Sequence, residues 1–293
     1  MNLKLTLLPI LGIFFCLLDL HAETADGKKP ESLGDACKRK LTALPGKSFK
    51  DALDVACKQV EVLPGCESVK GEKIFHFDKE ARPTEKNPKR ILVFSLIHGD
   101  EFPSGSVARS WMERLTSIEP RNEWRVVPIL NPDGLINKTR TNANGVDLNR
   151  NFPTKNWDEE AKTYWEKTTK KDKRRFPGKI AGSEPETKCA MKHIEDFKPD
   201  LILSLHTPYG VLDFDGPKIP PPNFPGIPWK NLGNYPGSLG RFMWVDHSKP
   251  TLTIELHGKG VTEKLEKFDK LQDVSGDIAI HAEKILKAQP AQD

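Results

Sequence analysis

Residues 91–101 read ILVFSLIHGDE, and this stretch decides the fold class. Its apolar first part predicts a buried β-strand. The strand ends in an imidazole and a carboxylate that follow one another closely, His98 and Glu101. In open α/β sheets, ligands bind at the carboxyl ends of the strands. The stretch therefore indicates an α/β protein with a functional site at the end of this strand.

The rest of the chain alternates between similar strands and amphipathic helices. The expected strands cover 90–97, 125–130, 200–206 and 251–256, and the expected helices cover 104–117, 184–197 and 274–288. This alternation predicts an α/β sheet with helices on its faces. Two further strands carry His206 and Glu255 at or near their ends. We therefore expect His98, His206 and Glu255 to share one site.

Two segments between these elements are typical of loops. Residues 131–157 are rich in Asn and Gly, and residues 216–237 are rich in Pro and Gly. Such compositions favour ordered, non-helical connections. We expect both loops to surround the strand-end site.

The composition excludes several classes of protein. The chain has 293 residues, of which 37% are hydrophobic and 29% are charged, which is typical of a soluble globular protein. The net charge of +4 is mild, and the sequence contains no nucleic-acid-binding motif, so we expect no nucleic-acid partner. The Lys and Arg residues within 167–175 are more typical of a solvated face than of a patch for an anionic surface.

The first 22 residues have the pattern of a secretory signal peptide. Lys4 precedes an apolar core at 5–18, and Ala22 supplies the small residue expected at a cleavage site. We expect cleavage after Ala22, a periplasmic or secreted location and no stable membrane insertion afterwards. Lipid attachment at Cys16 is disfavoured because bulky residues precede it where small ones are needed.

Removal of the signal peptide leaves an even number of cysteines, Cys37, Cys57, Cys66 and Cys189. In an exported chain this predicts disulfides. The sequence does not choose among the three possible pairings, and buried free thiols are the alternative.

Three of these cysteines lie in an N-terminal segment, residues 23–71, which carries two short helical patterns. The segment is too short to bury a core of its own. We expect it to cap a catalytic domain at 72–293, although a cleft-blocking pro-segment or a wall-docking module would fit as well.

The pair His98 and Glu101 is weak evidence alone, because solvated charges in a turn would look the same. Residues 131–153 change this, since they read NPDGLINKTRTNANGVDLNRNFP. Here the sequence resembles the zinc carboxypeptidase family, over roughly residues 90–290. Four parts occur in the family's order: H-x-x-E at 98–101, the N-P-D-G to D-L-N-R-N-F loop, His206, and Thr253-Ile254-Glu255. The resemblance implies an α/β/α sandwich with a mixed, mostly parallel central sheet.

Three further stretches resemble the bacterial cell-wall branch of this family. They are GSEPET at 182–187, DFDGP at 213–217 and YPGSLG at 235–240. That branch includes the murein peptide amidases, which cut the bond between γ-D-glutamate and meso-diaminopimelate. The resemblance implies an exported zinc metallopeptidase, expected to be a monomer, whose partner is a cell-wall peptide.

The resemblance also implies roles for individual residues. His98, Glu101 and His206 would bind one zinc ion and leave a position open for water. Glu255 would be the general base. Arg140 would stabilise the oxyanion, although Lys138 is close enough in sequence to be confused with it.

Substrate-binding roles follow in the same way. Asn149 and Arg150 would hold a substrate carboxylate, since the planar guanidinium grips one through two hydrogen bonds. Tyr235 lies closer to the Gly-Ser pair than the corresponding tyrosine of digestive members, so its equivalence stays open. Asp213 could meet an ammonium group, orient a ligand or cap a turn. Leu239, at the position that sets side-chain preference, indicates neither a basic nor an acidic pocket.

Three rival interpretations remain at this stage. The first is a carboxypeptidase for ordinary peptides. The second is a deacylase similar to the aspartoacylase relatives, which the complete loop and the late T-x-E disfavour. The third is a non-catalytic wall-binding protein on a peptidase scaffold, which the intact ligand set and Glu255 disfavour.

Overall fold

The structure of the protein is a computed structural model that describes residues 31–220, 222, 224, 226–258 and 264–288. The predicted signal peptide at 1–22 lies outside these residues. The chain divides into two units, Met1–Ser32 and Leu33–Asp293, and every element below belongs to the second.

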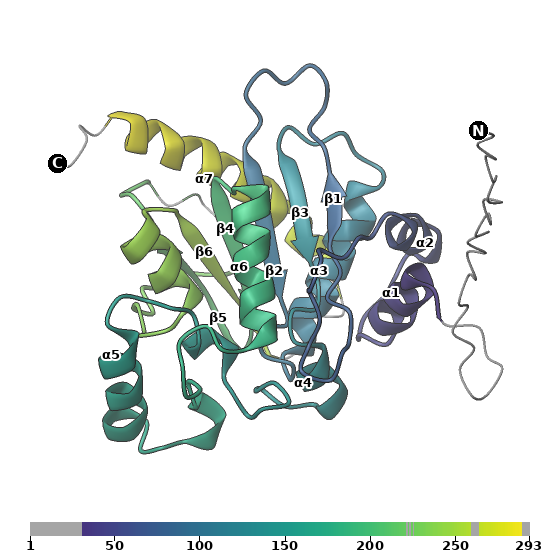
Figure 1. The fold of residues 1–293 in the computed structure, drawn as a ribbon. Helices are drawn as coiled ribbons and strands as arrows, with labels where there is room; N and C mark the ends of the chain where they lie inside the picture. The colour runs from purple at the N-terminus through teal and green to yellow at the C-terminus, as the bar shows by residue number, and fades with distance from the viewer. Residues whose placement is uncertain (1–30, 221, 223, 225, 259–263, 289–293) are drawn as a thin grey trace, which may run out of the picture. The chain divides into compact units, whose positions relative to one another are not determined.

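One mixed sheet organises this unit (Figure 1). In the described part of the chain its strands follow the order β1-β3-β2-β4-β6-β5. Their bounds are β1 Phe77–Lys79, β2 Arg90–Ser95, β3 Glu123–Val127, β4 Leu201–His206, β5 Tyr209–Asp215 and β6 Thr251–His257. The four inner strands are parallel, and only the edge strands β1 and β5 run antiparallel to their neighbours. The expected mixed, mostly parallel sheet is therefore confirmed.

The central strands are buried on both faces, which is why their sequences read as nearly continuous apolar runs. Every residue of β4 is buried, and only Arg90 of β2 is partly exposed. Along β2, Ile91 and Val93 join one hydrophobic cluster, whereas Leu92 and Phe94 join a second cluster on the other face. The sheet thus forms the middle layer of an α/β/α sandwich, as expected.

Helices cover both faces. The main ones are α1 Leu33–Thr42, α2 Lys50–Lys58, α3 Phe102–Leu115, α6 Pro185–Phe197 and α7 Asp269–Ala288, and the shorter ones are α4 Pro132–Asn137 and α5 Trp157–Thr163. Buried side chains of α1, α2, α3 and α7 belong to the first cluster, whereas those of α6 belong to the second. In Figure 1, α6 crosses one face of the sheet while α3 and α7 lie behind it. None of the described helices combines the length and the apolar character that a membrane crossing requires.

The N-terminal segment packs on α3. Cys37 and Leu41 of α1 and Leu53 of α2 share a cluster with Trp111 of α3. The guanidinium of the fully buried Arg109, also on α3, donates hydrogen bonds to carbonyl groups at the end of α1 and in the connection to α2, those of Leu41, Leu44, Pro45, Gly46 and Lys47. The expected boundary at residues 71 and 72 stays a prediction.

Two disulfides resolve the pairing that the sequence left open. Cys37 and Cys57 join α1 to α2, and Cys66 and Cys189 join the chain before β1 to α6. The N-terminal segment is therefore linked both to itself and to the main sandwich.

Candidate metal centre and active-site cleft

Parallel register brings three strand ends together at one edge of the sheet. β2 and β4 are paired so that Ser95 lies beside Leu205, and β4 and β6 are paired so that His206 lies beside Glu255. His98 lies three residues after Ser95, the last residue of β2. The rigid strands therefore place two imidazoles and one carboxylate at the same level of the sheet.

Glu101 joins them because α3 starts immediately after it. Helix α3 begins at Phe102, with Pro103 in its first turn, where proline is well tolerated. The turn between β2 and α3 also packs tightly against the following loop. A Cβ atom on Gly99 would overlap the backbone of Gly134, and a Cβ atom on Gly134 would overlap the side chain of Asn131, so both motifs need their glycine.

The three predicted metal ligands form a compact donor set. Nδ1 of His98 lies 2.8 Å from Oε1 of Glu101, and Nδ1 of His206 lies 3.0 Å from Oε2 of the same carboxylate. All three side chains are buried, and their donor atoms lie within 4.8 Å of one another. Two nitrogens and one carboxylate with a fourth side open are the donors of a catalytic zinc site, so the residues fit the ion that their pattern predicts.

Each imidazole is held through its other nitrogen. Nε2 of His98 lies 3.1 Å from Oδ1 of Asp147, and Nε2 of His206 lies 2.9 Å from Oγ of Ser204. Such partners fix the ring so that Nδ1 faces the metal position. The sequence reasoning missed both residues. Asp147 opens the D-L-N-R-N-F motif, and Ser204 lies two residues before His206 on the same side of β4.

Asp147 also holds Arg140. The guanidinium Nε and Nη2 atoms both lie 3.0 Å from Oδ2 of Asp147, and Nη1 lies 3.7 Å from Oε1 of Glu101. Burial opposes ionisation of Asp147, but Arg140 and His98 outweigh it and hold the pKa of this carboxyl well below its usual range. Arg140 lines the cleft, whereas Lys138 is exposed, ends α4 and is not among the lining residues. The geometry thus favours Arg140 over Lys138.

A cleft of about 720 Å³ opens above the metal ligands. All the side chains that the sequence singled out for the site line it: His98, Glu101, Arg140, Asn149, Arg150, His206, Asp213, Tyr235 and Glu255. Their individual roles stay predictions, but the structure brings the complete set to one cavity.

Glu255 lies on β6 beside the metal ligands. Its Oε2 accepts a hydrogen bond from the backbone N–H of Tyr209 at 3.4 Å. Burial raises the pKa of Glu255, and neighbouring Glu101 adds to this while His206 opposes it. A buried carboxylate with a raised pKa beside a metal site is suited to accept and return a proton.

Arg150 presents a cation to the cleft. Its guanidinium lies 4.8 Å from the ring of Tyr235. Its Nε is buried and has no hydrogen-bond partner among the described residues. Asn149 is held in place because its Oδ1 accepts from the backbone N–H of Leu239 at 2.9 Å. Leu239 itself is buried in the core, so the position expected to set side-chain preference does not reach the cleft.

An acidic pair lies on the edge strand β5, which the sequence analysis did not predict as a strand. Asp213 lines the cleft, and burial raises its pKa. Burial and the neighbouring Asp213 raise the pKa of Asp215 to about 6, although a hydrogen bond with Asn234 acts to lower it. With Asp213 and Arg150, the cleft lining therefore contains both a carboxylate and a guanidinium group.

A basic rim was also missed. Arg174 and Arg175 belong to the run expected to be a solvated face, and both are exposed, yet both line the cleft. Arg174 contacts Asp100, with 2.8 Å between Nη2 and Oδ2. Asp100 therefore faces this rim and contacts an arginine, in keeping with a role other than metal ligation.

Comparison with known proteins decides the family. Residues 49–215 match the family described as zinc carboxypeptidase, which is more than half of the chain. The chain belongs to the zinc carboxypeptidase family. This confirms the resemblance found in the sequence, and membership implies a zinc ion, for which His98, Glu101 and His206 are a fitting donor set.

Murein peptide amidases are among the relatives of this zinc carboxypeptidase. Murein peptide amidase A of Escherichia coli (strain K12) is 37% identical over 124 residues, which are 42% of this chain and 50% of that protein. The Vibrio campbellii (strain ATCC BAA-1116) protein of the same name is 33% identical over 148 residues, 50% of this chain and 57% of that one. The chain thus spans about half the length of these curated relatives.

Solved structures agree on the fold. The murein-tripeptide amidase of Escherichia coli O157 superposes with a TM-score of 0.55 at 24% identity, over 80% of this chain and 97% of that one. Thrombin activatable fibrinolysis inhibitor gives a TM-score of 0.62 at 16% identity, over 80% and 72% of the two chains. At these identities the likeness establishes the carboxypeptidase fold.

Proposed function

We propose that this protein is an exported hydrolytic metallopeptidase that cleaves the γ-D-glutamyl–meso-diaminopimelate bond of cell-wall peptides, with one zinc ion at His98, Glu101 and His206. One observation carries the proposal: the cleft that holds this donor set also offers Arg150 for a carboxylate and Asp213 for an ammonium group. As the C-terminal residue of the tripeptide, diaminopimelate carries a free carboxylate beside the scissile bond and an ammonium group at the far end of its side chain. The names of the murein peptide amidase relatives support the same substrate class.

Zinc, when bound, supplies a Lewis acid that acidifies water and polarises the scissile carbonyl. Glu255 takes a proton from the attacking water as the new carbon–oxygen bond forms, and returns it to the amine as the carbon–nitrogen bond breaks. Arg140 stabilises the negative charge on the carbonyl oxygen. Asp147 orients both His98 and Arg140 for these steps.

Substrate binding depends on the other walls of the cleft. The guanidinium of Arg150, with its unpaired Nε, binds the terminal carboxylate, and Asn149 and Tyr235 flank it. Asp213 meets the ammonium group of the diaminopimelate side chain. This assignment places opposite charges of the substrate against opposite charges of the protein.

Export and domain roles belong to the same proposal. Two disulfides and the signal-peptide pattern at 1–22 both support a periplasmic or secreted location. We assign residues 23–71 to a structural cap on a catalytic domain at 72–293, because α1 and α2 share the core of α3. The cap and the sandwich act as a monomer.

The decisive experiment uses the tripeptide L-Ala-γ-D-Glu-meso-diaminopimelate, with products followed by mass spectrometry. We expect chelator-sensitive release of free diaminopimelate, restored by added zinc. An α-linked dipeptide of Glu and diaminopimelate and ordinary peptides with C-terminal Lys or Leu serve as comparison substrates. Faster cleavage of the ordinary peptides would replace this proposal with a general carboxypeptidase. A folded protein that binds zinc and cleaves none of these substrates would point to a wall-binding protein.

A further inference from the structure

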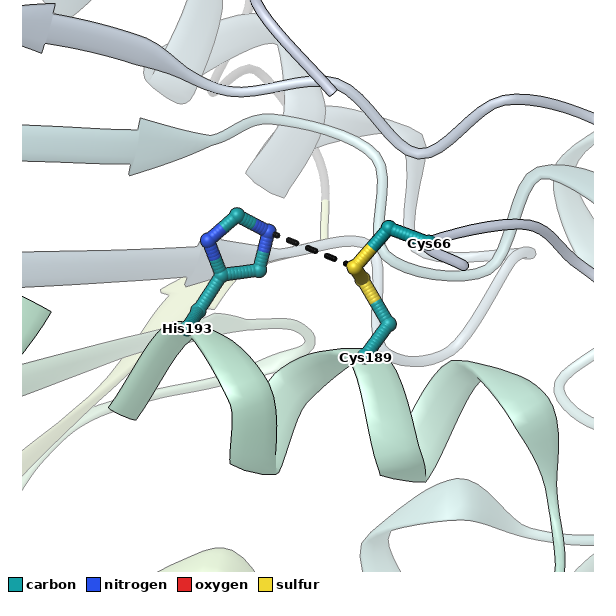
Figure 2. Close-up of side chains that lie close together, drawn as sticks. All are labelled: Cys66, Cys189 and His193. Atoms are coloured by element: carbon teal, nitrogen blue, oxygen red, sulfur yellow. Dashed lines mark hydrogen bonds between the residues drawn. A yellow bond between two sulfur atoms is a disulfide. The ribbon is translucent and has the colours of Figure 1, made fainter. Parts of the chain in front are cut away.

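A second cluster of metal-binding side chains lies away from the cleft (Figure 2). It consists of Cys66, Cys189 and His193, all of which are buried. Cys66 and Cys189 form a disulfide, and Sγ of Cys66 lies 4.0 Å from Nε2 of His193. The three donor atoms lie within 4.8 Å of one another. Figure 2 shows the imidazole directed at the disulfide rather than away from it.

Two elements arrange this cluster. Cys189 and His193 are four residues apart on α6, so their side chains lie on the same face of the helix, one turn apart. Cys66 approaches from the turn before β1, whose neighbours Pro64 and Gly65 are exposed. The helix thus fixes two of the donors, and a surface turn supplies the third.

Packing alone does not explain His193. It is fully buried beside the apolar cluster that includes Leu92, Phe94 and Ile202. Its Nδ1 has no hydrogen-bond partner within the described residues, although buried polar atoms nearly always have one. Burial lowers the pKa of His193 to about 3, so the ring is neutral and keeps a lone pair at physiological pH.

His76 makes the environment more unusual. Its ring lies edge-on to that of His193, with 4.9 Å between the centroids. His76 is also buried, and its Nδ1 has no partner in the part of the chain that the structure describes. Two buried imidazoles, each with an Nδ1 that has no hydrogen-bond partner among the described residues, are a costly pair to bury.

We propose that reduction of the Cys66–Cys189 disulfide turns this cluster into a second zinc site. A dithiol supplies two electrons and two protons and becomes a disulfide itself, so that the sulfur–sulfur bond breaks and two thiols form. A phosphine supplies the two electrons and becomes a phosphine oxide, with water giving the oxygen to phosphorus and the two protons to sulfur. Binding of Zn²⁺ then releases two protons and forms two zinc–thiolate bonds and one bond to Nε2 of His193. His76, whose ring centroid lies 4.9 Å from that of His193, is not one of these three donors, and water takes the fourth position.

Charge and ligand type select zinc for this position. Two thiolates and one neutral imidazole around a divalent ion give no net charge, which suits an apolar surrounding. Thiolate and imidazole donors are the ligands of structural zinc sites, whereas calcium and magnesium prefer oxygen. The other disulfide, Cys37–Cys57, differs, since the described residues place no third metal-binding donor beside it. It therefore serves as an internal control.

Zinc and the disulfide would fasten the same two elements. Both link the turn at 63–66 to α6, one by a covalent bond and the other by coordination. The reduced protein would therefore keep this junction when zinc is present. This site would be independent of the catalytic centre, because the two share no element. Its donors lie in the turn before β1 and on α6, whereas the catalytic donors lie after β2 and at the end of β4.

Cobalt(II) distinguishes the two sites, because only thiolate ligands give an intense sulfur-to-cobalt charge-transfer absorption. The chain, with Cys16→Ser to remove the remaining thiol, is reduced with a phosphine under argon, freed of metal and titrated with cobalt. Alkylation and mass spectrometry verify that the disulfides are open. We expect about two bound cobalt ions and the charge-transfer band in the reduced protein, and about one ion without the band in the oxidised protein.

Variants assign the band to its residues. Cys66→Ser with Cys189→Ser should abolish it, and His193→Ala should weaken cobalt binding by at least about tenfold. The matched control, Cys37→Ser with Cys57→Ser, should keep it. His98→Ala should remove the other ion and leave the band unchanged.

Two results would overturn the inference. The first is a reduced, folded protein, judged by circular dichroism, that binds cobalt without the thiolate band. The second applies if the reduced chain unfolds when it is metal-free. In that case, a chain that neither refolds nor develops the thiolate band when cobalt is added would also exclude the site. Refolding with the band would support it.

Discussion

Asp147 contacts His98 through one carboxylate oxygen and Arg140 through the other. A single buried side chain therefore orients a metal ligand and the cation proposed to stabilise the oxyanion. Asp147 is fully buried and ionised, so its negative charge also favours the positive charge of the ion that His98 would hold.

Replacing Asp147 by Asn should weaken zinc binding by about 10- to 100-fold, because the amide keeps the shape but loses the charge. Competition with a chromophoric chelator measures the affinity. Asp100→Asn is the matched control, since Asp100 lies in the same cleft but contacts Arg174 instead of a metal ligand. Equal zinc affinity in the two variants would remove Asp147 from the metal centre.

Glu255→Gln should lower turnover by about 10²- to 10⁴-fold while the protein still binds one zinc ion. The side chain keeps its size but cannot accept the proton of the attacking water. Single-turnover rates and metal analysis on the same samples separate the two effects. Turnover within a few-fold of the original would show that another group acts as the base.

Arg150→Lys should raise KM for the tripeptide by about tenfold or more and change kcat less, because a point charge replaces a planar fork. A tripeptide amide that lacks the terminal carboxylate provides the comparison, since its KM should not respond to this substitution. Arg241→Lys is the control, because Arg241 contacts Glu160 and does not line the cleft. This variant should leave KM unchanged for both substrates. A parallel loss for acid and amide would assign Arg150 a structural role.

Asp215 should make the protein less stable as the pH rises from about 4 to 6. Its pKa in the folded protein is about 6, above the ordinary value of 3.8. The unfolded chain therefore releases this proton first, and the folded state loses stability until Asp215 is itself ionised. The effect is on the order of 2 kcal/mol.

Asp215→Asn tests this directly, because the amide cannot ionise. Urea unfolding at pH 4 and pH 7 should show a smaller decrease in the free energy of unfolding for the variant than for the original protein. An unchanged difference between the two pH values would mean that Asp215 is not the group responsible.

The sequence predicted the strand ends well and the details around them less well. The apolar runs before His98 and His206 are typical of buried strands, and the parallel register of β2 and β4 brings their ends together. β5 escaped prediction because it is an edge strand that includes Gly210 and alternates apolar with acidic residues, which also fits a loop. The contact of Asp147 with His98 depends on the path of a long loop, and local sequence does not encode that path.

The same limit applies to Arg174 and to the disulfides. A run of Lys and Arg is usually solvated, and Arg174 is indeed exposed, but its position at the cleft follows from the packing of 164–176 around the site. Cysteine counts predict that disulfides form without choosing partners, since pairing is decided by which elements the fold brings within reach.

The Cys66–Cys189 link closes a covalent ring of chain, with a sequence separation of 123 residues. His98, Glu101, Arg140, Asn149 and Arg150 all lie inside this ring. A protease that cuts once between residues 67 and 188 therefore cannot separate the two pieces, and each keeps its share of the site. A nicked molecule would migrate as one species on a non-reducing gel and as two on a reducing gel. A protein with this connectivity can be cleaved once in an exposed loop and still remain a single molecule.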